Sequence, residues 1–133
     1  MNAKFFTSAL AATVTVFVGG WVIYGMILMD YMAAHSFMKE APAMWSIIVG
    51  NLFSGLLYAF VCQLGGIKSF GKGMTTGAIL GGLMGLPTNF LMYGGGMFDS
   101  ATPMILDTAG IIVLGGLGCG VAGALMGRGE SAA

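Results

Sequence analysis

The sequence predicts an all-α integral membrane protein, an up-down bundle of four transmembrane helices, on three observations. Hydrophobic residues make up 57% of the 133 residues and charged residues only 8%, whereas an ordinary soluble domain carries about 25% charged residues. Four apolar runs are long enough to cross a bilayer, which requires about 20 residues. Short connections join these runs, so consecutive helices are expected to be antiparallel neighbours.

The four expected spans cover residues 5–29, 43–64, 73–93 and 104–126. None of them contains Lys or Arg, and Asp107 is their single carboxylate. No connection is large enough for a second domain, so residues 1–133 are predicted to form a single membrane domain. The first run continues for about 25 residues without a small-residue cleavage site, so we interpret it as a span and not as a cleaved signal peptide.

The basic residues predict an orientation. An even number of spans places both termini on the same side of the membrane, and that side carries Lys4, Lys68, Lys72 and Arg128. Lys39 is the basic residue of the other side. By the positive-inside rule, both termini are expected to face the cytoplasm. The net charge of zero and the lack of a basic patch argue against nucleic acid as a partner.

Small residues recur at four-residue spacing along the spans. The rows singled out for helix packing are Gly73, Gly77, Gly81 and Gly85 in the third span and Gly116 and Gly120 in the fourth. Small residues allow close packing, which drives helix association in lipid. We expect the row of the third span to pack inside the bundle. The fourth span carries two adjacent rows, so we expect this broader groove to receive a helix from another protein or protomer.

Three polar side chains lie within the spans, and each is a candidate site residue with a plainer alternative. Asn51 is expected to hydrogen-bond across to another helix. Asn89 follows Pro87 closely, so it is interpreted first as part of a proline kink in which Thr88 and Asn89 satisfy the freed backbone groups. The functional alternative is a discontinuous helix at a binding site, as in transporters.

Asp107 is the third of these side chains. It follows Thr102 and Pro103, which are typical of a helix N-cap and first helical position. A carboxylate near a helix N-terminus is stabilised by the helix dipole, so an interfacial role is the plainer interpretation. A proton or cation site facing the bundle interior is the alternative.

Groups for catalysis or cofactor binding are few. The sequence has no H-E-x-x-H, G-x-S-x-G or P-loop motif, so the chain is not expected to be an enzyme. His35 is the one histidine and a candidate haem or pigment ligand, although it lies outside the spans, where a solvated or partner-contacting histidine is the plainer interpretation. Cys62 and Cys119 are interpreted as small buried hydrophobes and not as a disulfide or zinc site. No metal and no cofactor is predicted, but lipid, or a pigment or haem at a partner interface, remains open.

Three stretches carry a resemblance to a known group of proteins. They are "GGWVIYG" (19–25), "FMKE" (37–40) and "LDTAGIIVLGGLGCGVAGALMG" (106–127). With the four-span layout they resemble a family of small uncharacterised bacterial four-helix integral membrane proteins. The resemblance implies this topology and a bacterial origin, and hence a bacterial cytoplasmic membrane as the location. It implies no activity.

Two functions from different classes remain. The first is a non-catalytic accessory or structural subunit of a larger membrane complex, such as a respiratory or photosynthetic assembly, that packs through its glycine-rich helix faces onto other integral membrane subunits or onto copies of itself. The alternative is a small transporter or channel that uses Asp107, Asn51 and Asn89. The second interpretation predicts that these three side chains converge on one water-accessible cavity.

Overall fold

The computed structural model describes residues 1–36 and 43–130, and in these ranges the chain is helical apart from turns and an isolated bridge between Ser36 and Phe98. The elements are α1 (Ala3–Val22), the π-helix η1 (Ile23–Ile27), α2 (Met29–His35), α3 (Met44–Leu64), α4 (Phe70–Gly94) and α5 (Ala101–Met126). The all-α prediction is therefore confirmed. Lys39 and the "FMKE" stretch (37–40) lie outside the described residues.

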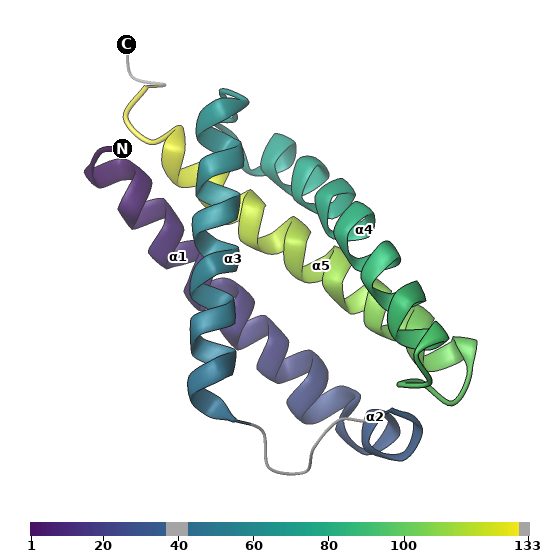
Figure 1. The fold of residues 1–133 in the computed structure, drawn as a ribbon. Helices are drawn as coiled ribbons and strands as arrows, with labels where there is room; N and C mark the ends of the chain where they lie inside the picture. Colours follow the sequence, from purple (N-terminus) through teal and green to yellow (C-terminus); the bar gives the residue numbers. More distant parts are fainter. Residues whose placement is uncertain (37–42, 131–133) are drawn as a thin grey trace.

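The long helices run alternately in opposite directions (Figure 1), so the start of α1 and the end of α5 lie at the same end of the bundle. We call this the terminal end, and we call the opposite end, which holds α2 and the α4–α5 connection, the distal end. α5 is central because it contacts α1, α3 and α4, whereas α3 packs against α1 and α5.

Three segments of the described chain are long and apolar enough to cross a membrane: Ala3–Ile27, Met44–Leu64 and Ala101–Met126. α4 is not among them although it has 25 residues, because its many glycines and Lys72 lower its hydropathy. Its outward side chains are nevertheless apolar and exposed, as Leu83 and Phe90 illustrate. The structure thus supports a membrane helical bundle with three spans, and the fourth span is part of the proposal below.

Capping side chains explain where two helices begin. The Asn2 side chain accepts a hydrogen bond from the Phe5 amide at 3.0 Å, and the Ser69 side chain caps α4 in the same way through Lys72. The predicted start of the last helix is wrong by two residues, because α5 begins at Ala101 and Pro103 is its third residue. Proline is tolerated there because the amides of the first turn have no partner within the helix.

Candidate functional site

α4 and α5 meet along a seam of glycines. The α4 side of this seam is a row of four buried residues, Gly73, Gly77, Gly81 and Gly85. A Cβ added to Gly77 would collide with the carbonyl oxygen of Gly115, and one added to Gly115 would lie 2.5 Å from the carbonyl oxygen of Gly77. At these points the two backbones approach more closely than any side chain permits.

The double row of α5 is also covered by this chain, which corrects the expectation that it forms an open groove for a partner. A Cβ added to Gly116 would lie 3.3 Å from the carbonyl oxygen of Met74, and one added to Gly120 would lie 2.9 Å from the ring of Phe70. Both covering residues belong to α4. The reason is that α5 sits at the centre of the bundle, so its small-residue faces are used by its own neighbours.

A polar cluster joins α4 to α5 near the distal end. The Asn89 amide nitrogen donates to Asp107 Oδ2 at 2.7 Å and to Thr108 Oγ1 at 2.9 Å. Asn89 is 1% exposed, and the Thr108 hydroxyl donates in turn to the carbonyl oxygen of Met104. The structure therefore brings together two of the three predicted polar residues, Asn89 and Asp107. It also adds Thr108, which the sequence analysis did not single out.

The proline of α4 does not divide that helix, which is continuous from Phe70 to Gly94. Thr88 donates to the carbonyl oxygen of Met84 within the helix, as the kink interpretation expects of a hydroxyl near proline. Asn89 instead reaches α5, so its predicted role as a partner for the backbone of its own helix is wrong. A side chain on the α5-facing side has Asp107 closer than any freed carbonyl.

The irregular turn of the bundle lies in η1, not in α4. There the Leu28 amide bonds to the carbonyl oxygen of Ile23, five residues back, at 2.8 Å. Single π-helical turns are frequent at functional sites. Tyr24, within this turn, donates its hydroxyl to the backbone carbonyl oxygen of Asp107 at 3.1 Å. The sequence contains Gly25 in this turn, but it offered no clear signal for this contact.

Asn51 lies far from this cluster, because it is on α3. Its amide donates to the carbonyl oxygen of Ile47, one turn earlier in the same helix, at 2.7 Å. The predicted hydrogen bond to another helix is therefore absent from the described residues, and the three polar side chains do not converge on one cavity. The physical reason is the direction of α3, whose residues 43–50 are all exposed.

The divergence of α3 begins at Gly55. A Cβ there would collide with Ala9 and Thr13 of α1, so this glycine marks the close crossing of the two helices. Towards the terminal end α3 buries Tyr58, Ala59 and Cys62. Towards the distal end it separates from the bundle, and Gly50 has no atom within 4 Å of an added Cβ. The distal half of α3, residues 44–54, is therefore largely without neighbours among the described residues.

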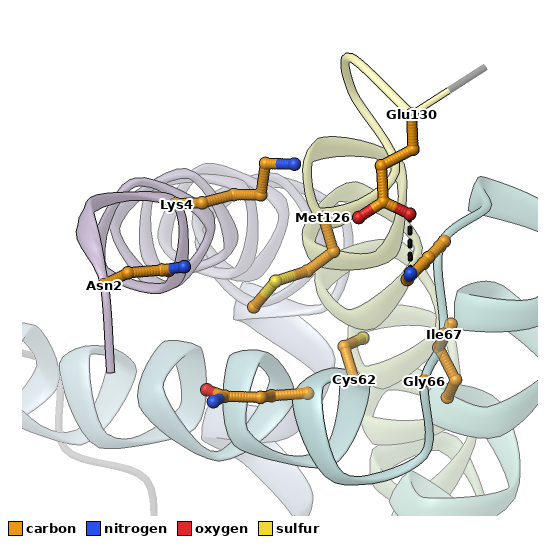
Figure 2. A pocket seen from close by; sticks show the side chains of 9 residues that line it. Asn2, Lys4, Cys62, Gly66, Ile67, Met126 and Glu130 are labelled. Carbon is orange, nitrogen blue, oxygen red and sulfur yellow. Dashed lines mark ion pairs between the residues drawn. The ribbon is translucent and has the colours of Figure 1, made fainter. Parts of the chain in front are cut away.

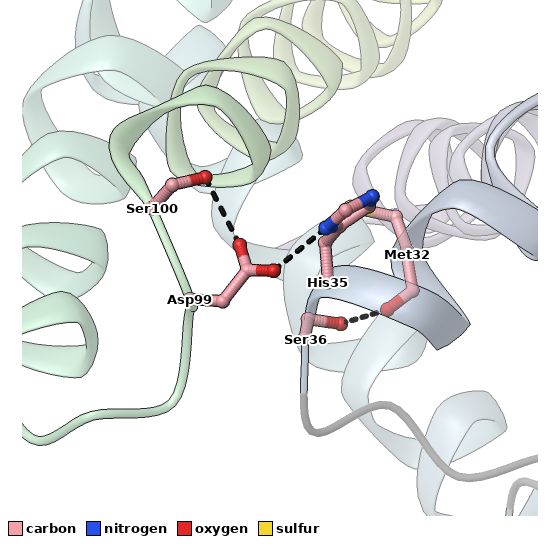
Figure 3. A network of polar contacts seen from close by, with 5 residues as sticks. All are labelled: Met32, His35, Ser36, Asp99 and Ser100. Carbon is pink, nitrogen blue, oxygen red and sulfur yellow. Dashed lines mark hydrogen bonds and ion pairs between the residues drawn. The ribbon is translucent and has the colours of Figure 1, made fainter.

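His35 takes part in a polar contact at the distal end (Figure 3). Its Nδ1 lies 2.6 Å from Asp99 Oδ2, and Ser100 donates to the other oxygen of the same carboxylate at 3.0 Å. The hydrogen bond with His35 is the main reason that the pKa of Asp99 is lowered from its usual value. The contact ties the end of α2 to the α4–α5 connection, and it engages one ring nitrogen of the candidate haem or pigment ligand.

A second ion pair lies at the terminal end, where Lys68 Nζ is 2.5 Å from Glu130 Oε2. This pair lowers the pKa of Glu130. Lys4 donates to the carbonyl oxygen of Arg128 at 2.8 Å. Together these contacts hold the residues that follow α5 over the start of α1 and the α3–α4 connection.

Beneath these contacts lies a cavity of about 160 Å³ (Figure 2). Its lining combines charged and polar side chains with Cys62 and Met126. Cys62 and Cys119, which the sequence places in separate apolar runs, are neighbours in the fold, with their Sγ atoms 3.5 Å apart. Within the described ranges, no group of three or more His, Cys, Asp or Glu side chains is placed to hold a metal ion.

The chain matches no protein-family model, no curated protein and no solved structure. The function is therefore argued from the geometry of the bundle alone.

Proposed function

We propose that the protein is a non-catalytic accessory subunit of a larger membrane assembly, and that a transmembrane helix of a partner subunit packs along the distal half of α3. The observation that carries this proposal is the contrast between glycine faces. The rows of α4 and α5 are closed against each other, whereas Gly50 of α3 is open and lies beside Asn51. The open face also contains Ser46 and Ser54, at four-residue spacing from Gly50.

The chemistry of Asn51 favours a helix over lipid as the occupant of this face. One amide N–H donates to Ile47 of its own helix, and the side-chain carbonyl oxygen has no recorded partner among the described residues. Hydrocarbon offers no donor to this oxygen, whereas a neighbouring helix with a polar side chain does. Such bonds contribute about 0.6 kcal/mol on average, and the open glycine adds close backbone approach.

The membrane setting of this proposal includes α4 as a fourth span. A 25-residue helix extends about 37 Å at 1.5 Å per residue, which exceeds the hydrocarbon thickness of about 30 Å. Its apolar outward face suits lipid, with Leu83 at 68% exposure. Four spans place both termini on one side, and Lys4, Lys68, Lys72 and Arg128 assign that side to the cytoplasm by the positive-inside rule. A bacterial cytoplasmic membrane, and a respiratory or photosynthetic complex in it, fit this arrangement.

The proposal is tested by photo-crosslinking in native membranes. A photoreactive residue at position 50 is expected to capture one integral membrane protein, identified by mass spectrometry, whereas the same residue at the lipid-facing position 83 of α4 captures lipid. Asn51→Leu is expected to reduce the adduct from position 50, and Asn51→Gln, which retains an amide, to preserve it. Adducts to lipid alone at both positions would refute a partner on this face.

The contact between Asn89 and Asp107 favours a second candidate, a small transporter or channel. A carboxylate within a span, held by a buried amide and close to a π-helical turn, is a plausible site for a proton or cation. This candidate would use Asn89 and Asp107, with Asn51 on a separate face. Flux of protons or monovalent cations into proteoliposomes should then be lost in Asp107→Asn. A docking subunit would keep its partner adduct in this variant, so the two functions are separable.

A further inference from the structure

Cys62 and Cys119 form an isolated thiol pair between α3 and α5. Their sulfur atoms lie 3.5 Å apart, and Cys62 Sγ is also 3.6 Å from the carbonyl oxygen of Cys119. Both residues are almost fully buried, at 1% and 0% exposure, and both are free thiols. The two sulfurs are therefore already in van der Waals contact, and a bond between them, about 2.05 Å long, requires each to move by less than an ångström.

The two thiols differ in their access to water. Cys62 lines the cavity at the terminal end, together with Lys4, Lys68 and Glu130, whereas Cys119 is not among the lining residues. Figure 2 shows the Cys62 side chain between Met126 and the turn at Gly66. A reagent that enters this cavity therefore meets Cys62 first, and Cys119 is reached only through Cys62.

We propose that Cys62 and Cys119 are a reversible dithiol–disulfide site oxidised by a small hydroperoxide that enters through this cavity. The sulfur of Cys62 attacks one oxygen of hydrogen peroxide, the O–O bond breaks, and the departing hydroxide takes a proton, which leaves a sulfenic acid on Cys62 and one water molecule. The sulfur of Cys119 then attacks Cys62 Sγ, the S–O bond breaks and a second water leaves. Two thiols and one peroxide thus give one disulfide and two water molecules.

The size of the cavity selects the oxidant class. A volume of about 160 Å³ has room for a few molecules of the size of water, each of which occupies about 30 Å³ in the liquid. Hydrogen peroxide fits this space, but a tripeptide disulfide such as oxidised glutathione does not. The product bond would join α3 to α5 near the terminal end, three residues before α3 ends at Leu64 and Gly65.

The test counts free thiols in the full-length protein. The reduced protein in lipid nanodiscs is exposed to hydrogen peroxide, quenched with catalase, denatured in SDS and labelled with a polyethylene-glycol maleimide, so that each free thiol adds one gel shift. We expect two shifts before oxidation, none after it, and two again after reduction. Labelling of the thiols is unaffected by oxidation of Met126, which makes the readout specific.

Two single variants test the order of the steps. In Cys119→Ser, hydrogen peroxide should leave Cys62 as a sulfenic acid that dimedone traps. In Cys62→Ser, Cys119 should keep its maleimide shift under the same exposure. The proposal is overturned if the wild-type protein retains two free thiols, if its disulfides join separate chains, or if Cys119 alone oxidises as fast as Cys62 alone. The wild-type measurement decides the case even where a variant folds poorly.

Discussion

Alanine at Gly77 tests the α4–α5 seam, and alanine at Gly50 is its matched control. Each substitution adds one methyl group to a helical glycine, which alone favours the helix by up to about 1 kcal/mol. At Gly50 nothing lies within 4 Å of the new Cβ, so the variant should gain up to about this amount. At Gly77 the Cβ collides with the backbone of Gly115 and the Cβ of Cys119, neither of which can rotate away.

The cost at Gly77 is that of separating two helices. Overpacking a well-packed interior typically costs about 1–3 kcal/mol, and a backbone collision belongs to the upper part of this range. After subtracting the helix propensity gain of about 1 kcal/mol, Gly77→Ala should lose about 2 kcal/mol. Gly85→Ala should fall between the two, because its nearest atoms are side-chain carbons of Ile111 at 3.2 Å, which can yield.

Reversible unfolding in mixed micelles, titrated with SDS and followed by circular dichroism, measures these differences in the purified protein. The expected order of stability is Gly50→Ala, then Gly85→Ala, then Gly77→Ala. If Gly77→Ala is as stable as Gly50→Ala, the α4 and α5 backbones are not in the contact described above, and the seam cannot be the main link between these helices.

Three further predictions concern polar contacts near the distal end. Asn89→Leu removes the donor to Asp107 and should reduce the free energy of unfolding by about 1–3 kcal/mol in the same titration, as for other buried polar groups left without partners; an unchanged midpoint would contradict the cluster. Tyr24→Phe removes only one bond to a backbone carbonyl and should cost about 0.6 kcal/mol, so a loss as large as that of Asn89→Leu would contradict this assignment. The lowered pKa of Asp99 means that ionised Asp99 stabilises the fold above its ordinary value of 3.8 and that this contribution is lost as the pH falls through the lower, folded-state value. Asp99→Asn should therefore flatten the pH dependence of the unfolding midpoint between about pH 5 and about pH 2, as should His35→Ala, and an unchanged slope in both would show that the contact does not form in solution.

Apolar run length predicted the helices well because it reflects a requirement that each helix meets by itself. The bounds of α3, Met44–Leu64, differ from the expected 43–64 by one residue. Which face of a helix meets which neighbour is a property of the whole bundle, and here the sequence was less informative. The glycine spacing of α4 indicated a packed face, but the same kind of spacing in α5 gave no sign that α4 and Phe70 cover it.

Contacts between residues far apart in the sequence were the least predictable. Cys62 and Cys119 are 57 residues apart, and Tyr24 and Asp107 are 83 apart, so no local pattern links them. Asn51 shows the same limit, because a helical asparagine has the same sequence signature whether it bonds to its own helix or to another. Only the crossing of α3 over α1 at Gly55 decides that Asn51 faces away from the bundle.

The π-helical turn at Ile23–Ile27 gives the distal end a built-in dependence on chain length. Because one backbone bond there spans five residues where an α-helix spans four, the turn accommodates one extra residue. Deleting a single residue from it would let α1 continue as a regular helix and would rotate α2 by about 100° about its axis. His35 would then point away from Asp99, so homologous chains that differ by one residue in this turn should also differ at that pair.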